Sequence, residues 1–243
     1  MKLIKLDAIP STNDFLKELS RDNSVKNFTV VVAKRQSNGR GQMGSEWKSE
    51  AGKNLTMSVL VKDIFNQHNE IFNLNIAVSL SVVEVLEFLN VPNLTIKWPN
   101  DIMSDSKKIG GILIENSFKT DKSIESIIGI GLNINQSDFL NLPNASSLFV
   151  ISKKQFDLDN ILIQIVERIK NNIALITDGK SSFLWEKFHQ KLFKIGTPMA
   201  FEDVNKNRFM GIIKGVSHDG KLQVLHQDES IKNYGIKEII LLY

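Results

Sequence analysis

Three glycine-containing segments, each beside or within an apolar run, place the strongest constraint on how this chain can fold. They are the stretch 39–44, the pair Gly110-Gly111, and Gly129 with Gly131. Glycine in a strand is unfavourable unless another group must approach the backbone closely. A bulge or a bend explains any one of these strands equally well. Three such segments in one domain favour a sheet that leaves its backbone open to a ligand.

Hydrophobic periodicity predicts a mixed α/β domain around these segments. Runs of β-branched and apolar residues indicate strands, and apolar residues at helical spacing indicate helices. The expected strands are residues 3–7, 28–33, 55–61, 94–98, 109–115 and 126–133. One expected helix begins at the cap residue Ser11 and runs to about residue 20, and the others cover residues 76–86, 158–177 and 183–191.

The pattern changes after Gly196. Short strand-like runs follow at residues 198–201, 208–216, 221–225 and 236–242, and Asp219-Gly220 is a favourable hairpin turn. We therefore expect two domains, a mixed α/β domain over residues 1–194 and a small β-barrel over residues 195–243.

Charge and composition exclude several classes of protein. The 30 Lys and Arg residues are scattered and nearly balanced by 27 Asp and Glu, so no basic run indicates nucleic-acid binding. An acidic residue, Asp7, precedes any apolar run long enough for a signal peptide, and no apolar stretch reaches the roughly 20 residues of a transmembrane helix. Cysteine is absent, which removes disulfides and thiol nucleophiles. We expect a cytoplasmic protein with no nucleic-acid or membrane partner.

No motif supports hydrolysis or a histidine metal site. The histidines lack metal-ligand spacing, and no serine lies in a Gly-x-Ser-x-Gly elbow. We expect surface or barrel positions for the four histidines, His68, His189, His218 and His226.

The first glycine segment has the chemistry of an anion-binding loop. Arg40 offers several donors to an anion, and the glycines around it allow backbone N–H groups to point at a phosphate or a carboxylate. The segment lacks the Gly-Lys-Ser/Thr of a Walker loop and the Gly-x-Gly-x-x-Gly of a Rossmann turn. Taken alone, it is equally typical of a flexible surface loop without a ligand.

The second segment joins a turn to a lysine pair. A strand that ends in Lys97-Trp98 and breaks at Pro99 places Asn100 and Asp101 on a turn at the end of the sheet. Such a turn is also common without any function, as are surface lysines such as Lys108. The third segment, residues 129–135, is another strand that contains glycine and ends in amides.

Together these residues resemble the biotin–protein ligases in order and approximate spacing. The shared features are Ser11-Thr12-Asn13, Gln36, Gly39-Arg40-Gly41, Trp47, Lys97 to Asp101, Lys108 to Glu115, and Gly129-x-Gly-x-Asn133. The Lys-Trp-Pro-Asn-Asp segment is the most specific of them. The similarity spans about residues 3–135, and the Trp185-Glu186-Lys187 helix followed by a small barrel resembles the family's C-terminal end. It implies a mixed-sheet, class II synthetase-like domain with an SH3-like barrel.

The resemblance implies an enzyme that joins biotin to ATP, releases pyrophosphate, and transfers biotin to a lysine of a biotin carboxyl carrier protein. Both first-step reactants are anions, so the site must neutralise their repulsion and align them. By this resemblance Lys108 is the catalytic lysine, and Arg40, in the loop that closes over biotin and the adenylate, is a second catalytic residue. The implied biotin-binding residues are Ser11, Thr12, Asn13, Gln36, Gly39, Arg40, Gly41, Gln42, Lys108, Gly111, Leu113 and Gly129.

The same resemblance places the nucleotide on the other side of the site, with Trp47 near the adenine. The implied ATP- and adenylate-binding residues are Arg40, Gln42, Trp47, Lys97, Asn100, Asp101, Lys108 and Asn133. Asp101 would hold Mg²⁺, which needs only one or two protein ligands when ATP carries it. We expect a monomer or a homodimer.

This chain departs from the family at two loop positions. The family usually has arginines where this chain has Gln42 and Ser45. A neutral contact in place of a charged one predicts a looser hold on biotinyl-adenylate, unless Lys34, Lys48 or Lys53 supplies the charge. Many relatives also carry an N-terminal helix-turn-helix module, whereas the first expected strand begins within a few residues of Met1, so we expect a ligase without a repressor half.

Two other functions remain open from the sequence. A lipoate–protein ligase shares the architecture and the adenylate chemistry, but that family lacks the Lys-Trp-Pro-Asn-Asp segment. A non-catalytic sensor would bind biotin and release no pyrophosphate.

Overall fold

A seven-stranded mixed sheet forms the larger part of the molecule. The computed structural model describes residues 1–64, 71–119, 124–139 and 142–243. In spatial order the strands are β1 (Lys2–Ile9), β2 (Thr29–Gln36), β3 (Leu55–Lys62), β7 (Ile124–Leu132), β6 (Lys107–Phe118), β5 (Asp101–Ser104) and β4 (Leu94–Lys97). β1 pairs in parallel with β2, and the other neighbours are antiparallel. The expected mixed-sheet α/β class is confirmed.

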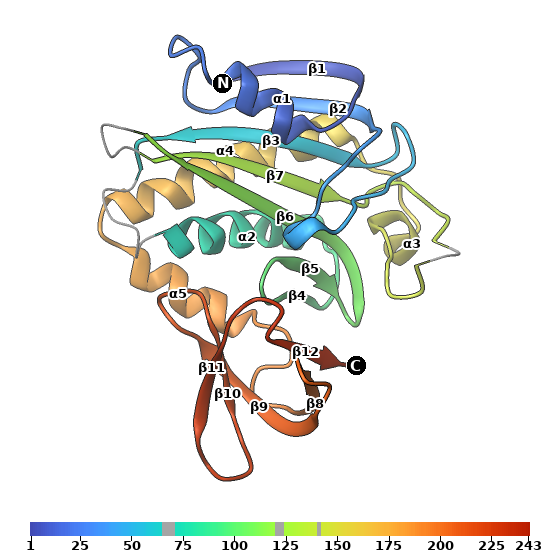
Figure 1. Cartoon of the computed structure of the whole chain (residues 1–243). Helices are drawn as coiled ribbons and strands as arrows, with labels where there is room; N and C mark the ends of the chain where they lie inside the picture. The colour runs from blue at the N-terminus through green and yellow to red at the C-terminus, as the bar shows by residue number, and fades with distance from the viewer. Residues whose placement is uncertain (65–70, 120–123, 140–141) are drawn as a thin grey trace.

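Helices cover the two faces of this sheet unequally (Figure 1). α2 (Ile71–Phe88) and α4 (Leu158–Thr177) lie behind the sheet, and α5 (Ser181–Gln190) packs against α2. α1 (Thr12–Leu19) lies in front, near β2 and β3. By length and composition α2 could cross a membrane, but most of it is buried as in the core helix of a globular domain.

The strands alternate between two hydrophobic clusters because successive side chains point to opposite faces. Val30 and Ile128 belong to the large cluster with α2 and α4, whereas their neighbours Val31 and Ile127 pack with Leu16 of α1. Since α1 is short, it covers only part of the front face. The rest of that face is where the glycine strands lie.

A second, antiparallel sheet follows α5. Its strands, in spatial order, are β11 (Ile231–Tyr234), β10 (Leu222–Leu225), β9 (Arg208–Val216), β8 (Pro198–Asp203) and β12 (Ile239–Leu242). This sheet agrees with the expected SH3-like C-terminal part. The large hydrophobic cluster continues into it through Phe201 and Ile213. The boundary between residues 194 and 195 therefore stays a prediction.

Several short elements were not expected from the sequence. They are β5, β11, α3 (Leu148–Ser152) and the 3-10 helix η1 (Gln42–Gly44). Elements of three to five residues carry too few side chains for a periodic signal. Two expectations were wrong in consequence. Asp101 is the first residue of β5 rather than part of a turn, and β12 begins at Ile239 because residues 236–238 form a turn.

Candidate active site

The floor of the site is a row of residues across four strands of the front face. Gly111 of β6 pairs with Gly131 of β7 and, on its other side, with Asp101 of β5. Gly131 pairs in turn with Thr56 of β3. Paired residues point to the same face of the sheet. The two glycines, which have no side chains, therefore lie between the Thr56 hydroxyl and the Asp101 carboxylate. The glycine strands thus create a hollow above the sheet, as the sequence predicted.

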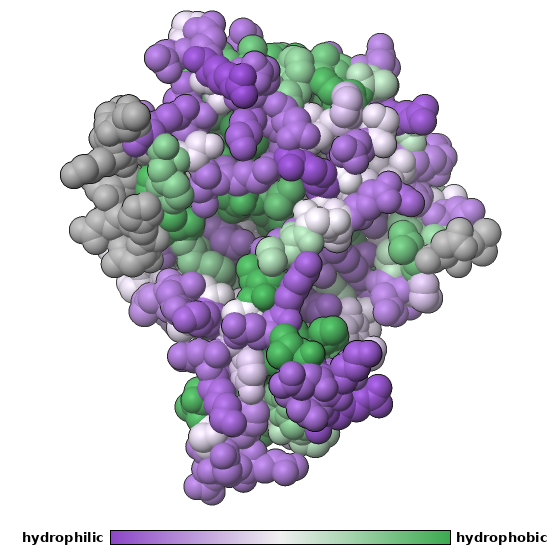
Figure 2. All heavy atoms as spheres, viewed as in Figure 1, coloured by the Kyte–Doolittle hydropathy of each residue, from purple (hydrophilic) through white to green (hydrophobic). Residues whose placement is uncertain are grey.

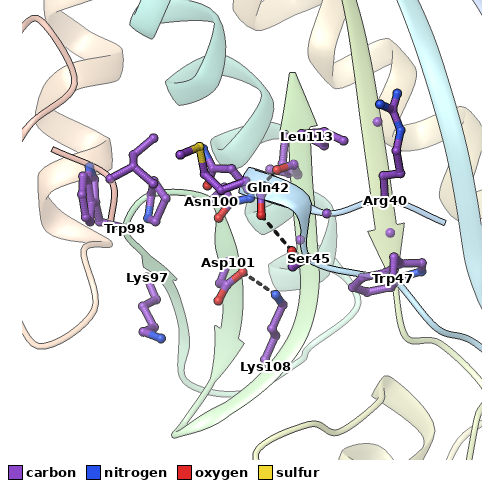
Figure 3. Close-up of a pocket in the computed structure, with 18 of the residues that line it drawn as sticks. Arg40, Gln42, Ser45, Trp47, Lys97, Trp98, Asn100, Asp101, Lys108 and Leu113 are labelled. Atoms are coloured by element: carbon purple, nitrogen blue, oxygen red, sulfur yellow. Dashed lines mark hydrogen bonds and ion pairs between the residues drawn. The ribbon is translucent and has the colours of Figure 1, made fainter. Parts of the chain in front are cut away.

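A β-bulge brings Lys108 onto this floor. In a regular strand Lys108 and Gly111, three residues apart, would point to opposite faces. The register between β5 and β6 shifts at Ile102 and Met103, which restores both residues to the same face. The Lys108 ammonium lies 2.6 Å from an Asp101 carboxylate oxygen (Figure 3). A Cβ added at Gly111 would lie 3.5 Å from the Lys108 Nζ, so the ammonium lies directly over the glycine.

Lys97 enters the site from the end of β4, and Asn100 enters it from the turn between β4 and β5. Residues 98–100 form this turn, which contains a cis peptide bond between Trp98 and Pro99. Asn100 is buried, its side-chain amide donates to the carbonyl of Ile112, and its own carbonyl accepts from the Ile112 N–H at 3.0 Å. The turn is therefore fixed to β6 rather than free to move.

The opposite end of the hollow is polar. Thr12 donates to the Gln36 amide oxygen through its N–H at 2.7 Å and its hydroxyl at 2.9 Å. The Ser58 hydroxyl lies within hydrogen-bond distance of the Thr12 hydroxyl (2.8 Å) and of the Asn13 amide oxygen (2.6 Å), and its single proton can be donated to one of them at a time. Ser11, Thr12 and Asn13 are all nearly fully buried at the start of α1. This network presents several fixed donors and acceptors to one small volume.

Gly129 makes room for this network. A Cβ at that position would lie 2.5 Å from the Asn13 amide oxygen. Asn13 also donates to a Glu115 carboxylate oxygen at 2.7 Å, which holds the amide across β6 and β7. The glycine in β7 is therefore needed so that α1 can lie close to the sheet.

The glycine loop covers the hollow and is folded rather than extended. The Gly41 N–H donates to the Ser45 carbonyl at 2.7 Å, and the Trp47 N–H donates to the Gly39 carbonyl at 2.9 Å. The Trp47 ring lies against Gly131, and no described residue accepts a hydrogen bond from its buried indole N–H. The loop thus forms a hydrogen-bonded turn that contains η1, and its flexibility stays a prediction.

These parts surround a cavity of about 360 Å³. Figure 2 shows the hollow between the two sheets on this face. The predicted residues that line the cavity are Ser11, Thr12, Asn13, Gln36, Arg40, Gly41, Gln42, Trp47, Lys97, Asn100, Asp101, Lys108, Gly111, Leu113 and Gly129. The cavity combines apolar walls, fixed polar groups and a lysine ammonium, which suits a small, partly apolar anion.

The family of the chain follows from comparison with known proteins. Residues 6–133 match the biotin/lipoate A/B protein ligase family. The chain belongs to this family.

Its relatives extend the match beyond that segment. The bifunctional ligase/repressor BirA of Bacillus spizizenii is 34% identical over 241 residues, which cover 95% of this chain and 71% of that protein. The biotin–[acetyl-CoA-carboxylase] ligase of Mycobacterium tuberculosis is 25% identical over 87% of this chain and 79% of its own. The biotin protein ligase from Aquifex aeolicus, solved in complex with biotin and ATP, superposes with a TM-score of 0.81 at 28% identity and covers 99% of this chain and 98% of that one. The chain is thus an enzyme of the biotin–protein ligase type, as the sequence predicted.

In this ligase the side chain of Arg40 is held away from the cavity floor. Its guanidinium pairs with Asp14 and lies 3.0 Å from the carboxylate of Glu115. In Figure 3 it points away from Lys108 and Asp101. Its assigned contact with the adenylate would require the side chain to leave these two carboxylates.

Two predicted residues lie outside the cavity lining. Gly39 is in the loop beside it, where a Cβ would approach the Gln36 amide nitrogen to 2.9 Å. Asn133 is buried just after the end of β7, where its side-chain amide donates to the Ser146 carbonyl at 3.0 Å. The structure gives Asn133 a part in positioning residues 144–146, which in turn bond the backbone of Lys108. Its contact with the nucleotide remains a prediction.

The sequence also missed contributors to this ligase site. Ser58 and Glu115 complete the polar end through their contacts with Asn13. The alternation of residues along a strand predicts which face of the sheet each side chain points to, but it does not predict the contact with Asn13. The second sheet supplies Phe201, Leu222 and Lys237 to the cavity. No local signal could have identified these three, because only the packing of the second sheet brings them to the site.

The histidines take no part in the cavity, as far as the described residues show. His189 accepts a hydrogen bond from the Val216 N–H at 3.0 Å, and His226 lies 2.8 Å from the Tyr234 hydroxyl. His218 packs against Trp185, and His68 lies outside the described residues. Among the residues that the structure describes, no group of three or more histidines and carboxylates could hold a metal ion.

Proposed function

We propose that this ligase activates biotin with ATP to form biotinyl-5′-AMP and then transfers biotin to a specific lysine of a biotin carboxyl carrier protein. The observation that carries the proposal is the Lys108 ammonium, which lies over the floor glycine Gly111 and lines the same cavity as the polar end and the β4–β5 turn. The ligase type of the relatives and a solved neighbour with both biotin and ATP support the choice of substrates.

In the first step an oxygen of the biotin carboxylate attacks the α-phosphorus. The new O–P bond forms as the bond to the β-phosphate breaks, and the electron pair leaves with pyrophosphate. Lys108 would bind both anions and so reduce their repulsion in the low-dielectric cavity. In the second step the neutral amine of the acceptor lysine attacks the acyl carbon, a C–N bond forms, AMP leaves, and the amine releases a proton.

The polar end would hold the biotin ring system. Ser11, Thr12, Asn13 and Gln36 offer both donors and acceptors, as a ureido group requires. Gly111, Leu113 and Gly129 would contact the apolar part of the ligand, with Gly39, Gly41 and Gln42 of the loop above it.

The nucleotide would lie toward the turn and the second sheet. Trp47 offers an aromatic wall, Asn100 and Asn133 offer amides, and Lys97 adds a positive charge near the phosphates. Arg40 would reach the adenylate after it leaves Asp14 and Glu115.

The donor set fits Mg²⁺ only as an ion that ATP carries. Of the two carboxylates among the described residues that line the cavity, Glu46 and Asp101, it is Asp101 that lies on the floor, and one protein ligand is enough for such an ion. Asp101 would therefore hold Mg²⁺, which supplies charge neutralisation on the phosphates. We also propose a cytoplasmic location and a monomeric or homodimeric state.

A biotin-dependent ATP–pyrophosphate exchange assay tests the proposal. We expect exchange in the wild type, loss of at least about 100-fold in Lys108→Ala, and normal exchange in the neighbour Lys107→Ala, whose ammonium donates to the Pro143 carbonyl outside the cavity. Exchange that depends on lipoate would favour a lipoate–protein ligase. Biotin binding without exchange would favour a sensor.

A further inference from the structure

Lys237 joins the second sheet to the tip of the glycine loop. Its ammonium donates to the carbonyl of Met43 at 2.9 Å, across 194 residues of sequence. Lys237 and its neighbour Ile236 both line the cavity. The contact therefore spans the cavity opening from the side opposite the seven-stranded sheet.

The lysine is presented from a fixed turn. Residues 236–238 connect β11 to β12, and Lys237 has a left-handed backbone conformation with φ +68°. The Glu238 carboxylate accepts from the Gly235 N–H at 2.6 Å, and the Glu238 N–H donates to the Gly235 carbonyl at 3.1 Å. Next to the turn, Ile239 is buried in the hydrophobic cluster. Only the side chain of Lys237 needs to be ordered for the contact to form.

The same sheet is fastened to the other wall of the cavity. The Trp98 indole N–H donates to the Gly220 carbonyl at 2.9 Å, and the Lys97 ammonium lies 4.7 Å from the centre of the Tyr243 ring. Trp98 is the first residue of the turn that carries Asn100, and Lys97 directly precedes this turn. The second sheet therefore contacts the β4–β5 turn on one side and the loop on the other.

Arg40, the cation of the loop over residues 39–47, is paired with carboxylates outside the loop, so another residue must hold the loop over the cavity. Arg40 pairs with Asp14 and Glu115, and positions 42 and 45 are neutral. Lys34 pairs with Asp7, Lys48 pairs with Glu46, and these two lysines and Lys53 lie outside the cavity lining. Lys237 instead directs its charge to a neutral backbone carbonyl at the loop tip.

We propose that Lys237 is a positioning residue that holds residues 39–47 over the cavity and so slows escape of the acyl-adenylate before transfer. The retention part of this role rests on the proposed function, whereas the loop contact does not. A charge-assisted hydrogen bond at the rim of a cavity predicts an effect on the order of three- to tenfold.

The test compares Lys237→Met, which keeps the stem but removes the donor, with Lys237→Arg and with Lys232→Met on the adjacent strand. Two quantities are measured. They are the hydrogen exchange of amides 39–47 in the protein without ligand, and the release of biotinyl-adenylate after biotin, ATP and Mg²⁺ are removed by gel filtration. We expect Lys237→Met to speed both about three- to tenfold, Lys237→Arg to stay close to the wild type, and Lys232→Met to change neither.

Each outcome separates the two proposals. Unchanged loop exchange in Lys237→Met would overturn the positioning role, whatever the activity of the protein. Faster loop exchange with unchanged adenylate release would overturn retention alone. A wild type that forms no biotinyl-adenylate would overturn the proposed function, and loop exchange would still decide whether Lys237 holds the loop.

Discussion

The ammonium of Lys108 and the carboxylate of Asp101 lie 2.6 Å apart on adjacent strands that a β-bulge brings into register. Without this bulge the two side chains would lie on opposite faces of the sheet. The carboxylate thus aims the ammonium at the floor of the cavity, and several consequences can be measured.

Asp101→Asn removes the charge that aims Lys108. Since the lysine would then sample other positions, we expect biotin-dependent pyrophosphate exchange to slow about 10- to 100-fold, mainly through kcat. Asp105→Asn is the control, because Asp105 is exposed on the next turn and accepts from the Asn93 amide. Equal kinetics for Asp101→Asn and the wild type would remove the aiming role.

Gly129→Ala tests the space that the polar end requires. The added methyl would lie 2.5 Å from the Asn13 amide oxygen, so we expect a loss of about 1–3 kcal/mol in stability and a raised KM for biotin. Gly111→Ala is the contrast, since its methyl would meet Lys108 at an ordinary 3.5 Å and the protein should keep its melting temperature. Thermal unfolding and biotin titration measure both effects, and a Gly129→Ala protein with normal values of both would contradict the proposed role of this glycine.

Asp14→Asn weakens the hold on Arg40. If Arg40 must leave Asp14 and Glu115 to reach the adenylate, the variant should retain biotinyl-adenylate about two- to fivefold longer at low salt. Glu18→Gln on the same helix is the control, because Glu18 pairs with Arg21 at the surface, and this change should have no effect. Faster release in Asp14→Asn would show that Arg40 acts from its present position.

Gln42→Arg restores a charge that the family usually has in the loop. We expect less labelling of a bystander protein in the presence of biotin and ATP, because a charge-assisted contact should hold the adenylate more tightly. Gln190→Arg adds the same charge at the exposed end of α5 and should leave labelling unchanged. Equal bystander labelling by the wild type and Gln42→Arg would contradict this expectation.

His226 should make the second sheet less stable in mild acid. Burial, with the charge of Lys232, lowers the pKa of His226 below its usual value. The unfolded chain, in which histidine titrates near pH 6.5, therefore binds the proton more readily. Stability should fall slightly as the pH drops from about 7 to 5, and less so in His226→Gln. Parallel melting curves of the two proteins measure this difference.

The sequence predicted most of the elements because their residues carry a periodic signal. α4 has the expected bounds of residues 158–177, and β9 has the expected bounds of residues 208–216. The glycines of the cavity floor were also predicted, because each of them lies within a strand that the sequence itself predicts. The short strands β5 and β11 escaped because pairing with their neighbours, rather than local periodicity, stabilises them.

The tertiary structure alone decided which residues meet. The sequence determined the family, the mixed α/β class and the set of polar residues around three glycine segments, since these depend on residue type and order. It could not place Lys108 beside Asp101, pair Arg40 with Asp14 and Glu115, or bring Lys237 to the loop. These contacts follow from a bulge, from a helix laid across the sheet, and from the packing of a second sheet. Each joins residues far apart in the chain or out of strand register, so no local pattern encodes it.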